Sequence, residues 1–184
     1  SLARAREPST AALARGARNR GAEINRHTTV TGIERLPNGE WKVLTDKGDV
    51  TCEHVVSATG NFARTTGRMV GVNVPVIPVQ HPYIVTEAHP AIVKRKAQGL
   101  PEMGVLRESD SSWYMREEAG GLLLGPYEKG APACYVDGPS ADSEYELFPE
   151  DLDRLGPHIE TAIARVPAFG EVGVKKVYNG AIAY

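Results

Sequence analysis

The sequence has few cysteines, no long apolar run and no large excess of charge of either sign. Its two cysteines, Cys52 and Cys134, lie far apart without the spacing of metal ligands, so neither a disulfide scaffold nor a metal site is expected. No apolar run approaches the roughly 20 residues of a membrane span. The net charge of -2 lacks the basic excess of a nucleic-acid-binding protein. Neither a membrane nor a nucleic acid is therefore an expected partner.

Several motifs of nucleotide-binding and hydrolytic enzymes are also absent. The sequence contains no Walker loop, no serine nucleophile elbow and no Gly-x-Gly-x-x-Gly loop, which holds the pyrophosphate in dinucleotide-binding proteins. The chain does not begin with Met and ends at Tyr184 within an apolar run, so we expect both ends to lie inside a longer protein. What remains is 184 residues, 41% hydrophobic and 24% charged, which suits one good core or two small ones.

The first 70 residues carry the signals of a helix followed by a three-stranded meander. Pro8-Ser9-Thr10 is a helix start, and Gly21 occupies the position of a C-terminal glycine. Two turns, Pro37-Asn38-Gly39 and Asp46-Lys47-Gly48, separate runs of alternating apolar residues. The pattern predicts helices at 11–20 and 62–70, meander strands at 30–36, 41–43 and 50–52, and short strands at 22–24 and 55–58.

The pattern changes after Gly71. Three prolines, Pro75, Pro78 and Pro82, fall within the apolar stretch 72–85, which excludes a helix and favours edge strands or bulges. A long helix is expected after Pro149, because apolar residues then recur at helical spacing. The predicted elements are this helix at 149–166 and strands at 103–106, 112–117, 122–124 and 173–178.

These patterns predict an α+β fold with two domains. Residues 1–70 would form an α/β domain with a β-meander. Residues 71–178 would form a mainly antiparallel domain with one long helix. Residues 179–184 would begin the return of the chain to the first domain.

The segment HVVSATG at 54–60 is the first candidate ligand site. It is a β-branched run that ends in the small residues Ala58, Thr59 and Gly60. Small side chains at the carboxyl end of a strand let a ligand approach the backbone, and open α/β sheets bind their ligands at those ends. A tight strand-to-helix turn without a ligand would explain the same residues, so the segment alone leaves both interpretations open.

His81 is the second candidate, because it lies inside an otherwise apolar strand. With a period of two, it shares a face with Val79, Tyr83 and Val85. A buried histidine must be hydrogen-bonded, and burial shifts its pKa toward the neutral form. The commoner alternative is a hydrogen-bonded core histidine with no catalytic role.

The stretch 112–116 divides its side chains between two faces. Ser112, Tyr114 and Arg116 lie on one face, and Trp113 and Met115 on the other. The first face offers a hydroxyl, a phenol and a guanidinium, which suit a small zwitterion. The alternative is a solvent-facing surface above a packed Trp113 and Met115.

Taken together, these segments resemble the glycine-oxidase-like (D-amino acid oxidase) superfamily of FAD-dependent oxidoreductases, and within it the dimethylglycine and sarcosine dehydrogenase branch. The resemblance covers nearly the whole chain. It is carried by EPS at 7–9, RGAEI at 20–24, VVSATG at 55–60, HPYIVTE at 81–87, WYMRE at 113–117, GLLLGPYE at 121–128 and ELFPEDL at 146–152. The last two segments are distinctive of the branch.

The resemblance implies that FAD lies along a Rossmann layer and that the antiparallel domain covers its isoalloxazine ring. The residues 1–70 would then be part of an FAD-binding domain, an incomplete fold that lacks the N-terminal Rossmann βαβ unit, and 71–178 would be the substrate domain. The implied site residues are His81 and Tyr114 as catalytic residues, and Val30, Ala58, Thr59 and Gly60 as cofactor contacts. Tyr83 shares the face of His81 and Arg116 the face of Tyr114, so we expect both to bind the substrate.

The implied reaction moves a hydride equivalent from an N-methyl carbon of a small amine to the flavin. The glycine-rich loop and the histidine that carries covalent flavin in the branch would precede Ser1, and a tetrahydrofolate-binding module would follow Tyr184. The isolated chain is therefore expected to be inactive and to bind FAD weakly. The expected compartment is the cytoplasm of a bacterium or the mitochondrial matrix of a eukaryote.

Two alternatives remain at this point. The chain could be a non-enzymatic binding module that kept the fold, or an enzyme of the same superfamily that acts on another amine or amino acid. A Gly-x-Gly-x-x-Gly loop upstream of Ser1 would favour an enzyme, and turnover assays on the whole protein would identify the substrate.

Overall fold

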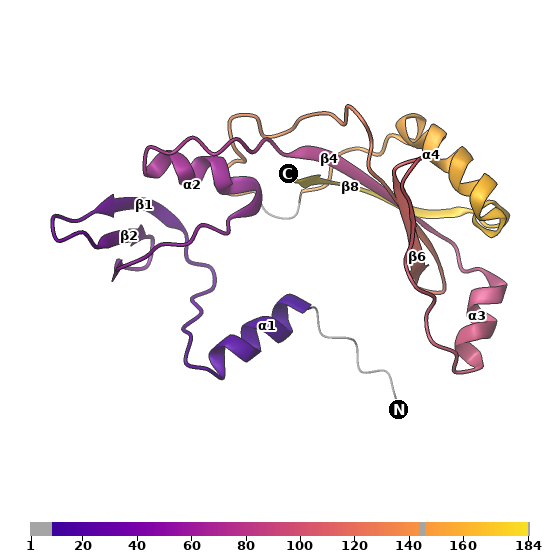
Figure 1. The fold of residues 1–184 in the computed structure, drawn as a ribbon, viewed down its shortest axis with the longest axis horizontal. Helices are drawn as coiled ribbons and strands as arrows, with labels where there is room; N and C mark the ends of the chain where they lie inside the picture. Colours follow the sequence, from indigo (N-terminus) through magenta and orange to yellow (C-terminus); the bar gives the residue numbers. More distant parts are fainter. Residues whose placement is uncertain (1–8, 144–145, 184) are drawn as a thin grey trace. The chain divides into compact units, whose positions relative to one another are not determined.

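The computed structural model describes residues 9–143 and 146–183 (Figure 1). The chain divides into two compact units, with the boundary between Val56 and Ser57. We call the described residues up to Val56 the meander unit and those from Ser57 on the sheet unit. Compact units and functional domains need not coincide, so the domain ranges 1–70, 71–178 and 179–184 stay predictions. Pro8, in the predicted helix start, lies outside the described residues.

The meander unit confirms the predicted helix and three-stranded meander. Its strands pair antiparallel in the order β1-β2-β3, as adjacent hairpins do. Gly39 has a φ of +89°, which a glycine adopts without the steric cost of a Cβ, and its N–H donates to Leu36 O at 2.9 Å to close the first turn. The elements are α1 (Ser9–Arg18), β1 (Val30–Arg35), β2 (Trp41–Thr45) and β3 (Val50–Cys52).

The prediction of two short strands, at 22–24 and 55–58, is wrong. Neither segment pairs with another strand within the described part of the chain. An isolated extended segment has no ladder to satisfy its backbone, so it is solvated instead. Val55 and Val56 are accordingly 38% and 87% exposed.

The sheet unit is built on five antiparallel strands in the order β5-β6-β7-β4-β8. This confirms the predicted α+β class, with a mainly antiparallel sheet and one long helix. The helix begins at Leu152 instead of Pro149, because the carboxylate of Asp151 caps it by accepting from Arg154 N at 3.2 Å. The elements are η1 (Gly60–Phe62), α2 (Ala63–Met69), β4 (Val79–Thr86), α3 (Pro90–Ala97), β5 (Leu106–Glu108), β6 (Trp113–Glu118), β7 (Gly121–Pro126), α4 (Leu152–Arg165), η2 (Pro167–Glu171) and β8 (Val174–Ile182).

Strand β4 is internal in this sheet, so the expectation of an edge strand is wrong. The Gln80 N–H donates to Pro132 O at 2.9 Å, on the side of β4 away from β8. Because backbone groups alternate along a strand, the missing N–H of Pro82 falls on that same side. Pairing with β7 begins only at Ile84, so the proline removes no hydrogen bond from either ladder. The register of β4 against β8 shifts between Val85 and Thr86, beyond the last of the three prolines.

The two faces of the sheet differ in what covers them. One face packs against α4 and η2, and its core includes the fully buried Trp113, Ile84, Leu124 and Leu155. The indole Nε1–H of Trp113 donates to Thr161 Oγ1 of α4 at 3.1 Å, so its polar group is satisfied. The core does not extend to the opposite face, where half-buried tyrosines lie.

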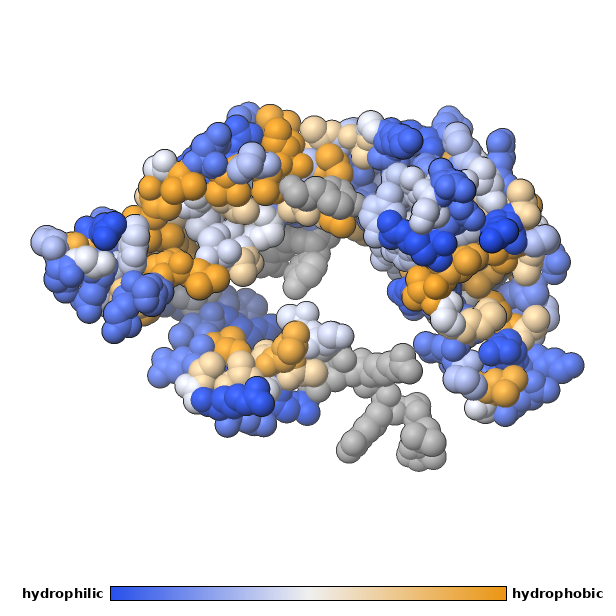
Figure 2. Space-filling model, viewed as in Figure 1, coloured by the Kyte–Doolittle hydropathy of each residue, from blue (hydrophilic) through white to orange (hydrophobic). Residues whose placement is uncertain are grey.

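Apolar surface also remains between α2 and β4. Figure 2 shows hydrophobic side chains gathered over this segment, in which Val70, Val72 and Ile77 are exposed. Among the described residues, no helix has the length and apolar character to cross a membrane.

Candidate active site

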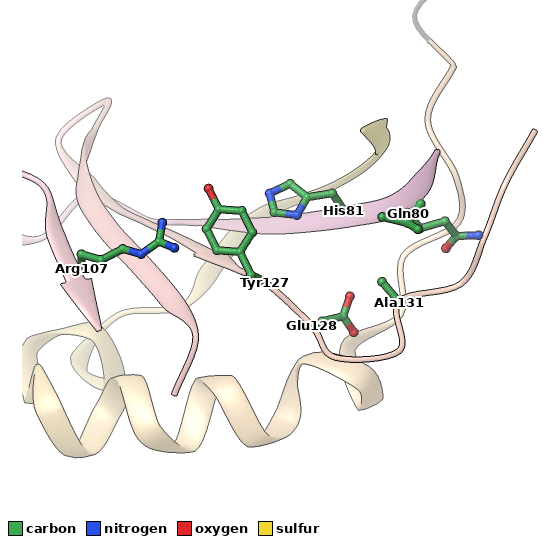
Figure 3. A pocket seen from close by; sticks show the side chains of 7 residues that line it. Gln80, His81, Arg107, Tyr127, Glu128 and Ala131 are labelled. Atoms are coloured by element: carbon green, nitrogen blue, oxygen red, sulfur yellow. The ribbon is translucent and has the colours of Figure 1, made fainter. Parts of the chain in front are cut away.

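The imidazole of His81 lies in the wall of a cavity of about 320 Å³ in the sheet unit. Figure 3 shows His81 beside the ring of Tyr127, with Arg107 and Glu128 on either side of this pair. Strand β4 supplies the histidine, β5 the arginine, and the segment after β7 the tyrosine and the carboxylate. The residues that line the cavity are Val79, Gln80, His81, Arg107, Tyr127, Glu128 and Ala131.

Tyr127 links the other functional side chains of this face. Its ring centroid lies 5.2 Å from that of His81 and 5.8 Å from that of Tyr114. The guanidinium carbon of Arg107 lies 4.6 Å from the Tyr127 centroid, within the range of a cation–π contact. Tyr127 thus contacts both His81 and Tyr114, although of these two only His81 lines the cavity.

Gly125 of β7 leaves the space that the Tyr114 ring occupies. A Cβ added at Gly125 would meet Cζ of Tyr114 at 2.2 Å and its hydroxyl at 2.5 Å. No real Cβ makes such contacts, so any other residue here would displace the ring. The glycine that opens GLLLGPYE has a different role, since a Cβ at Gly121 would meet the carbonyl of Glu87 at 2.4 Å.

Burial decides the charge states of the site. Burial lowers the pKa of His81, and the negative charge of Glu128 opposes this effect. The imidazole is therefore neutral over a wider pH range than an exposed histidine. Burial raises the pKa of Tyr114, the neighbouring Tyr127 adds to the rise, and Arg116 opposes it. Tyr114 thus keeps its hydroxyl proton at neutral pH.

The two predicted substrate-binding residues lie on the same face but outside the cavity. The Tyr83 ring stacks on Tyr178 of β8, with centroids 4.9 Å apart and planes 20° apart. Arg116 pairs with Glu118, at 2.5 Å from Nη1 to Oε2. To receive a substrate carboxylate, Arg116 would have to exchange this partner.

The predicted cofactor contacts lie in two places. Ala58, Thr59 and Gly60 form an exposed turn at the start of the sheet unit, and η1, which begins at Gly60, lies beside β8. The Thr59 hydroxyl is within 3.1 Å of Ser57 Oγ and accepts from Thr66 Oγ1 of α2 at 3.1 Å. Val30 is the first residue of β1 in the meander unit and is 39% exposed.

Of the residues that line the cavity, sequence reasoning predicted only His81 as a site residue, and it missed the aromatic and charged residues beside it. Tyr127 and Glu128 lie in the segment GLLLGPYE, which was noted for its resemblance but assigned no role. Their positions at the end of a strand were the available signal. Arg107 gave no signal of its own, since only the pairing of β5 with β6 places it opposite Tyr114. Across residues 9–143 and 146–183, no three metal-ligating side chains form a cluster.

Comparison with known proteins identifies the family. The family described as FAD dependent oxidoreductase (DAO) matches residues 7–184. The chain is 39% identical over 180 residues to mitochondrial dimethylglycine dehydrogenase of Mus musculus, covering 95% of this chain and 20% of that protein. It is 33% identical over 174 residues to mitochondrial sarcosine dehydrogenase of Mus musculus, covering 91% and 18%. The chain therefore spans about a fifth of the length of these relatives.

A solved structure shows the same fold. The L-proline dehydrogenase of P. horikoshii superposes with a TM-score of 0.70 at 23% identity, over 94% of this chain and 42% of that one. The family match covers nearly the whole sequence and includes the strands that form the cavity. The chain belongs to the DAO family of FAD-dependent oxidoreductases.

Proposed function

We propose that this chain is part of a flavin-dependent enzyme that oxidises a small N-methylated amino acid of the dimethylglycine or sarcosine type. The observation that carries the proposal is the His81 imidazole in the wall of a cavity of about 320 Å³, beside Tyr127 and Arg107. This volume is at the lower end of the range for small-molecule sites. The names of the mouse relatives, dimethylglycine and sarcosine dehydrogenase, support this substrate class.

Two features of the sheet unit fit a flavin dinucleotide. A Cβ added at Gly60 would meet no atom within 4 Å, so a ligand can come close to the exposed backbone of this turn. Tyr127 offers a flat ring beside His81, and the ring of Tyr114 lies next to Tyr127. Ala58, Thr59 and Gly60 would contact FAD through the exposed backbone of this turn. Val30, in the meander unit, stays a separately proposed backbone contact. When bound, FAD supplies the acceptor for the hydride that leaves an N-methyl carbon.

His81 would accept the proton that the substrate must lose first. An ammonium has no lone pair to release, so only the free amine can be oxidised. A neutral imidazole can take the ammonium proton on its free ring nitrogen, and the lowered pKa of His81 favours this neutral form. Tyr114, whose pKa is raised, would act as a phenol that hydrogen-bonds in the same region.

Two arginines are candidates for the substrate carboxylate. Arg107 lines the cavity and stacks on Tyr127, so its charge is already directed to the place where a substrate would lie. Arg116 remains a second candidate, although Glu118 engages it. Tyr83 would contribute an apolar wall beside them, stacked on Tyr178. The iminium product would be hydrolysed, or captured by tetrahydrofolate elsewhere in the whole protein.

The test uses the whole flavin-containing protein and the variant His81→Gln. Flavin reduction by dimethylglycine in a single turnover should slow by at least about tenfold, since a positioned acid–base group typically contributes 100- to 10,000-fold. His27→Gln, which changes an exposed histidine of the meander unit, is the matched control and should leave the rate unchanged. An unchanged rate in His81→Gln would remove His81 from the reaction.

Substrate choice is tested on the same protein with sarcosine, dimethylglycine and proline-like amines. Reduction of bound flavin by a proline-like amine alone would assign the enzyme to another branch of the family. Bound flavin that none of these amines reduces would favour a non-enzymatic binding module. We expect the protein in the mitochondrial matrix if its host is a eukaryote and in the cytoplasm if it is a bacterium. The relatives named as mitochondrial support the first location.

A further inference from the structure

Glu128 is a carboxylate in the wall of the cavity whose own charge is almost entirely enclosed. Its side chain is 8% exposed, and Arg154 of α4 holds it with two bonds. The Arg154 Nε donates to Oε1 at 3.1 Å, and the terminal Nη2 donates to Oε2 at 2.6 Å. This two-pronged arrangement fixes the carboxylate in orientation as well as in position.

The third side-chain nitrogen of Arg154, Nη1, connects this ion pair to strand β4, which carries His81. Its Nη1 donates to Oε1 of Gln80, the residue before His81, at 3.0 Å. Asn179 of β8 donates to the same oxygen at 3.0 Å and to Pro149 O at 2.9 Å, and it is 1% exposed. Two donors on one amide oxygen leave Gln80 little freedom to rotate.

A purely structural role for this cluster is a weak explanation of its charge. Enclosing an ion pair costs desolvation free energy that apolar residues of the same size would avoid. The cluster also lies at the functional cavity and not in the apolar core, since Gln80 and Glu128 both line the cavity with His81. Its place therefore points to an effect on the imidazole.

We propose that Glu128, fixed by Arg154 and Gln80, is a positioning residue for His81 that holds a compensated negative charge at the wall of the cavity. The inference rests on the proposed function, in which His81 accepts the substrate proton. The positive charge of Arg154 opposes the field of Glu128, which favours a neutral imidazole that can accept a proton. An uncompensated Glu128 would favour the imidazolium more strongly.

Among the described side chains that line the cavity with His81, Glu128 carries the negative charge. Burial and Glu128 act on the histidine in opposite directions. Opposite His81, β8 places Gly180, which has no charge. The other titratable or charged groups on this face lie farther along the sheet or across the cavity. They are Tyr83 of β4, Arg107 of β5, Tyr114, Arg116 and Glu118 of β6, Tyr127 after β7, and Lys176 and Tyr178 of β8.

The test is an NMR titration of the His81 ring C–H signals in the whole chain, with the signals assigned by their loss in His81→Gln. In Glu128→Gln the titration midpoint should move to lower pH, because a charge that favours the imidazolium is removed. In Arg154→Gln it should move to higher pH, because Glu128 is no longer compensated. Glu108→Gln is the matched control. Its carboxylate also pairs with an arginine of α4, Arg165, at 3.5 Å, but it does not line the cavity.

Shifts of opposite sign support the proposal, and a purely structural cluster would not produce them. Midpoints that stay at the wild-type value, or that move in the same direction in both variants, would overturn it. If Arg154→Gln fails to fold, Glu128→Gln and the conservative Arg154→Lys decide: the first must shift and the second must stay near wild type. Opposite shifts together with normal flavin reduction in His81→Gln would retain the positioning role and reject the proposed function.

Discussion

The meander unit and the sheet unit differ in how much apolar surface each of them buries. In the described part of the meander unit, Ile33 is the one buried hydrophobic residue, at 8% exposure, and α1 buries none. In the sheet unit, five buried hydrophobic residues have a relative exposure of 0%: Ile84, Trp113, Leu124, Leu155 and Ala162. Both units form hydrogen-bonded antiparallel ladders.

This difference shows that strands can pair through backbone hydrogen bonds without forming a hydrophobic core. A three-stranded meander satisfies its backbone through local hairpins, but it needs a second layer to cover its apolar side chains. In the sheet unit α4 provides that layer on one face. The opposite face is left for the aromatic side chains of the cavity, so a rigid core supports the candidate site directly.

The largest expected contrast between the two units is the loss of stability when a large apolar side chain is replaced by alanine. Trp113→Ala should lower the free energy of unfolding of the sheet unit by about 3–5 kcal/mol, because it leaves a large void in the core. Leu13→Ala in α1, which is 75% exposed, should change stability by less than about 0.5 kcal/mol. Urea unfolding followed by circular dichroism measures both. Equal effects would mean that the meander unit has a core of its own.

Two glycines give a smaller contrast. Gly125→Ala should destabilise by about 1–3 kcal/mol, because the new methyl group collides with the Tyr114 ring. Gly16 in α1 has open space around it, so Gly16→Ala should stabilise the helix by about 0.5–1 kcal/mol. Thermal unfolding of the two variants against the wild type tests the opposite signs. A destabilising Gly16→Ala would reveal a neighbour of α1.

The smallest effect is a difference in acid sensitivity. Burial lowers the pKa of His81 from 6.5, so the folded sheet unit binds fewer protons than the unfolded chain as the pH falls below about 6.5. Its stability should therefore fall from that pH down through the folded pKa of His81. In the meander unit, the hydrogen bond from Lys42 lowers the pKa of Asp49 from 3.8. The contribution of Asp49 to stability is therefore complete above pH 3.8 and is lost only below it.

The two tryptophans allow the pH dependence of stability to be measured separately in each unit. Trp41 lies in the meander unit and Trp113 in the sheet unit, so Trp41→Phe leaves a fluorescence reporter of the second and Trp113→Phe a reporter of the first. The slope of stability between pH 7 and 5 should appear with the Trp113 reporter and disappear when His81→Gln is added. A slope that persists in His81→Gln would assign the acid sensitivity to another group.

Local signals were sufficient for the elements whose partners are close in sequence. The glycine turns predicted the meander, and the alternation at 112–116 correctly separated buried Trp113 from Tyr114 on the opposite face. Local signals failed where the pairing partner of a segment was distant in sequence or absent. The run at 55–58 is β-branched but has no neighbouring strand, and Pro82 is tolerated inside the sheet only because one ladder starts two residues later. The helix α3, capped by His89 with Pro90 in its first turn, was not predicted.

The same limit applies to the candidate site, where His81 was found from sequence but Glu128 and Arg154 were not. An imidazole in an apolar strand is a local anomaly and is visible in the pattern. A carboxylate and an arginine 26 residues apart are ordinary surface residues until folding encloses them together. Amino-acid order by itself determined the family, the alternation of strand faces and the turns, because these depend on neighbours along the chain. The tertiary structure alone decided the strand order, the cavity and the enclosed ion pair, because these depend on contacts between segments that the sequence keeps far apart.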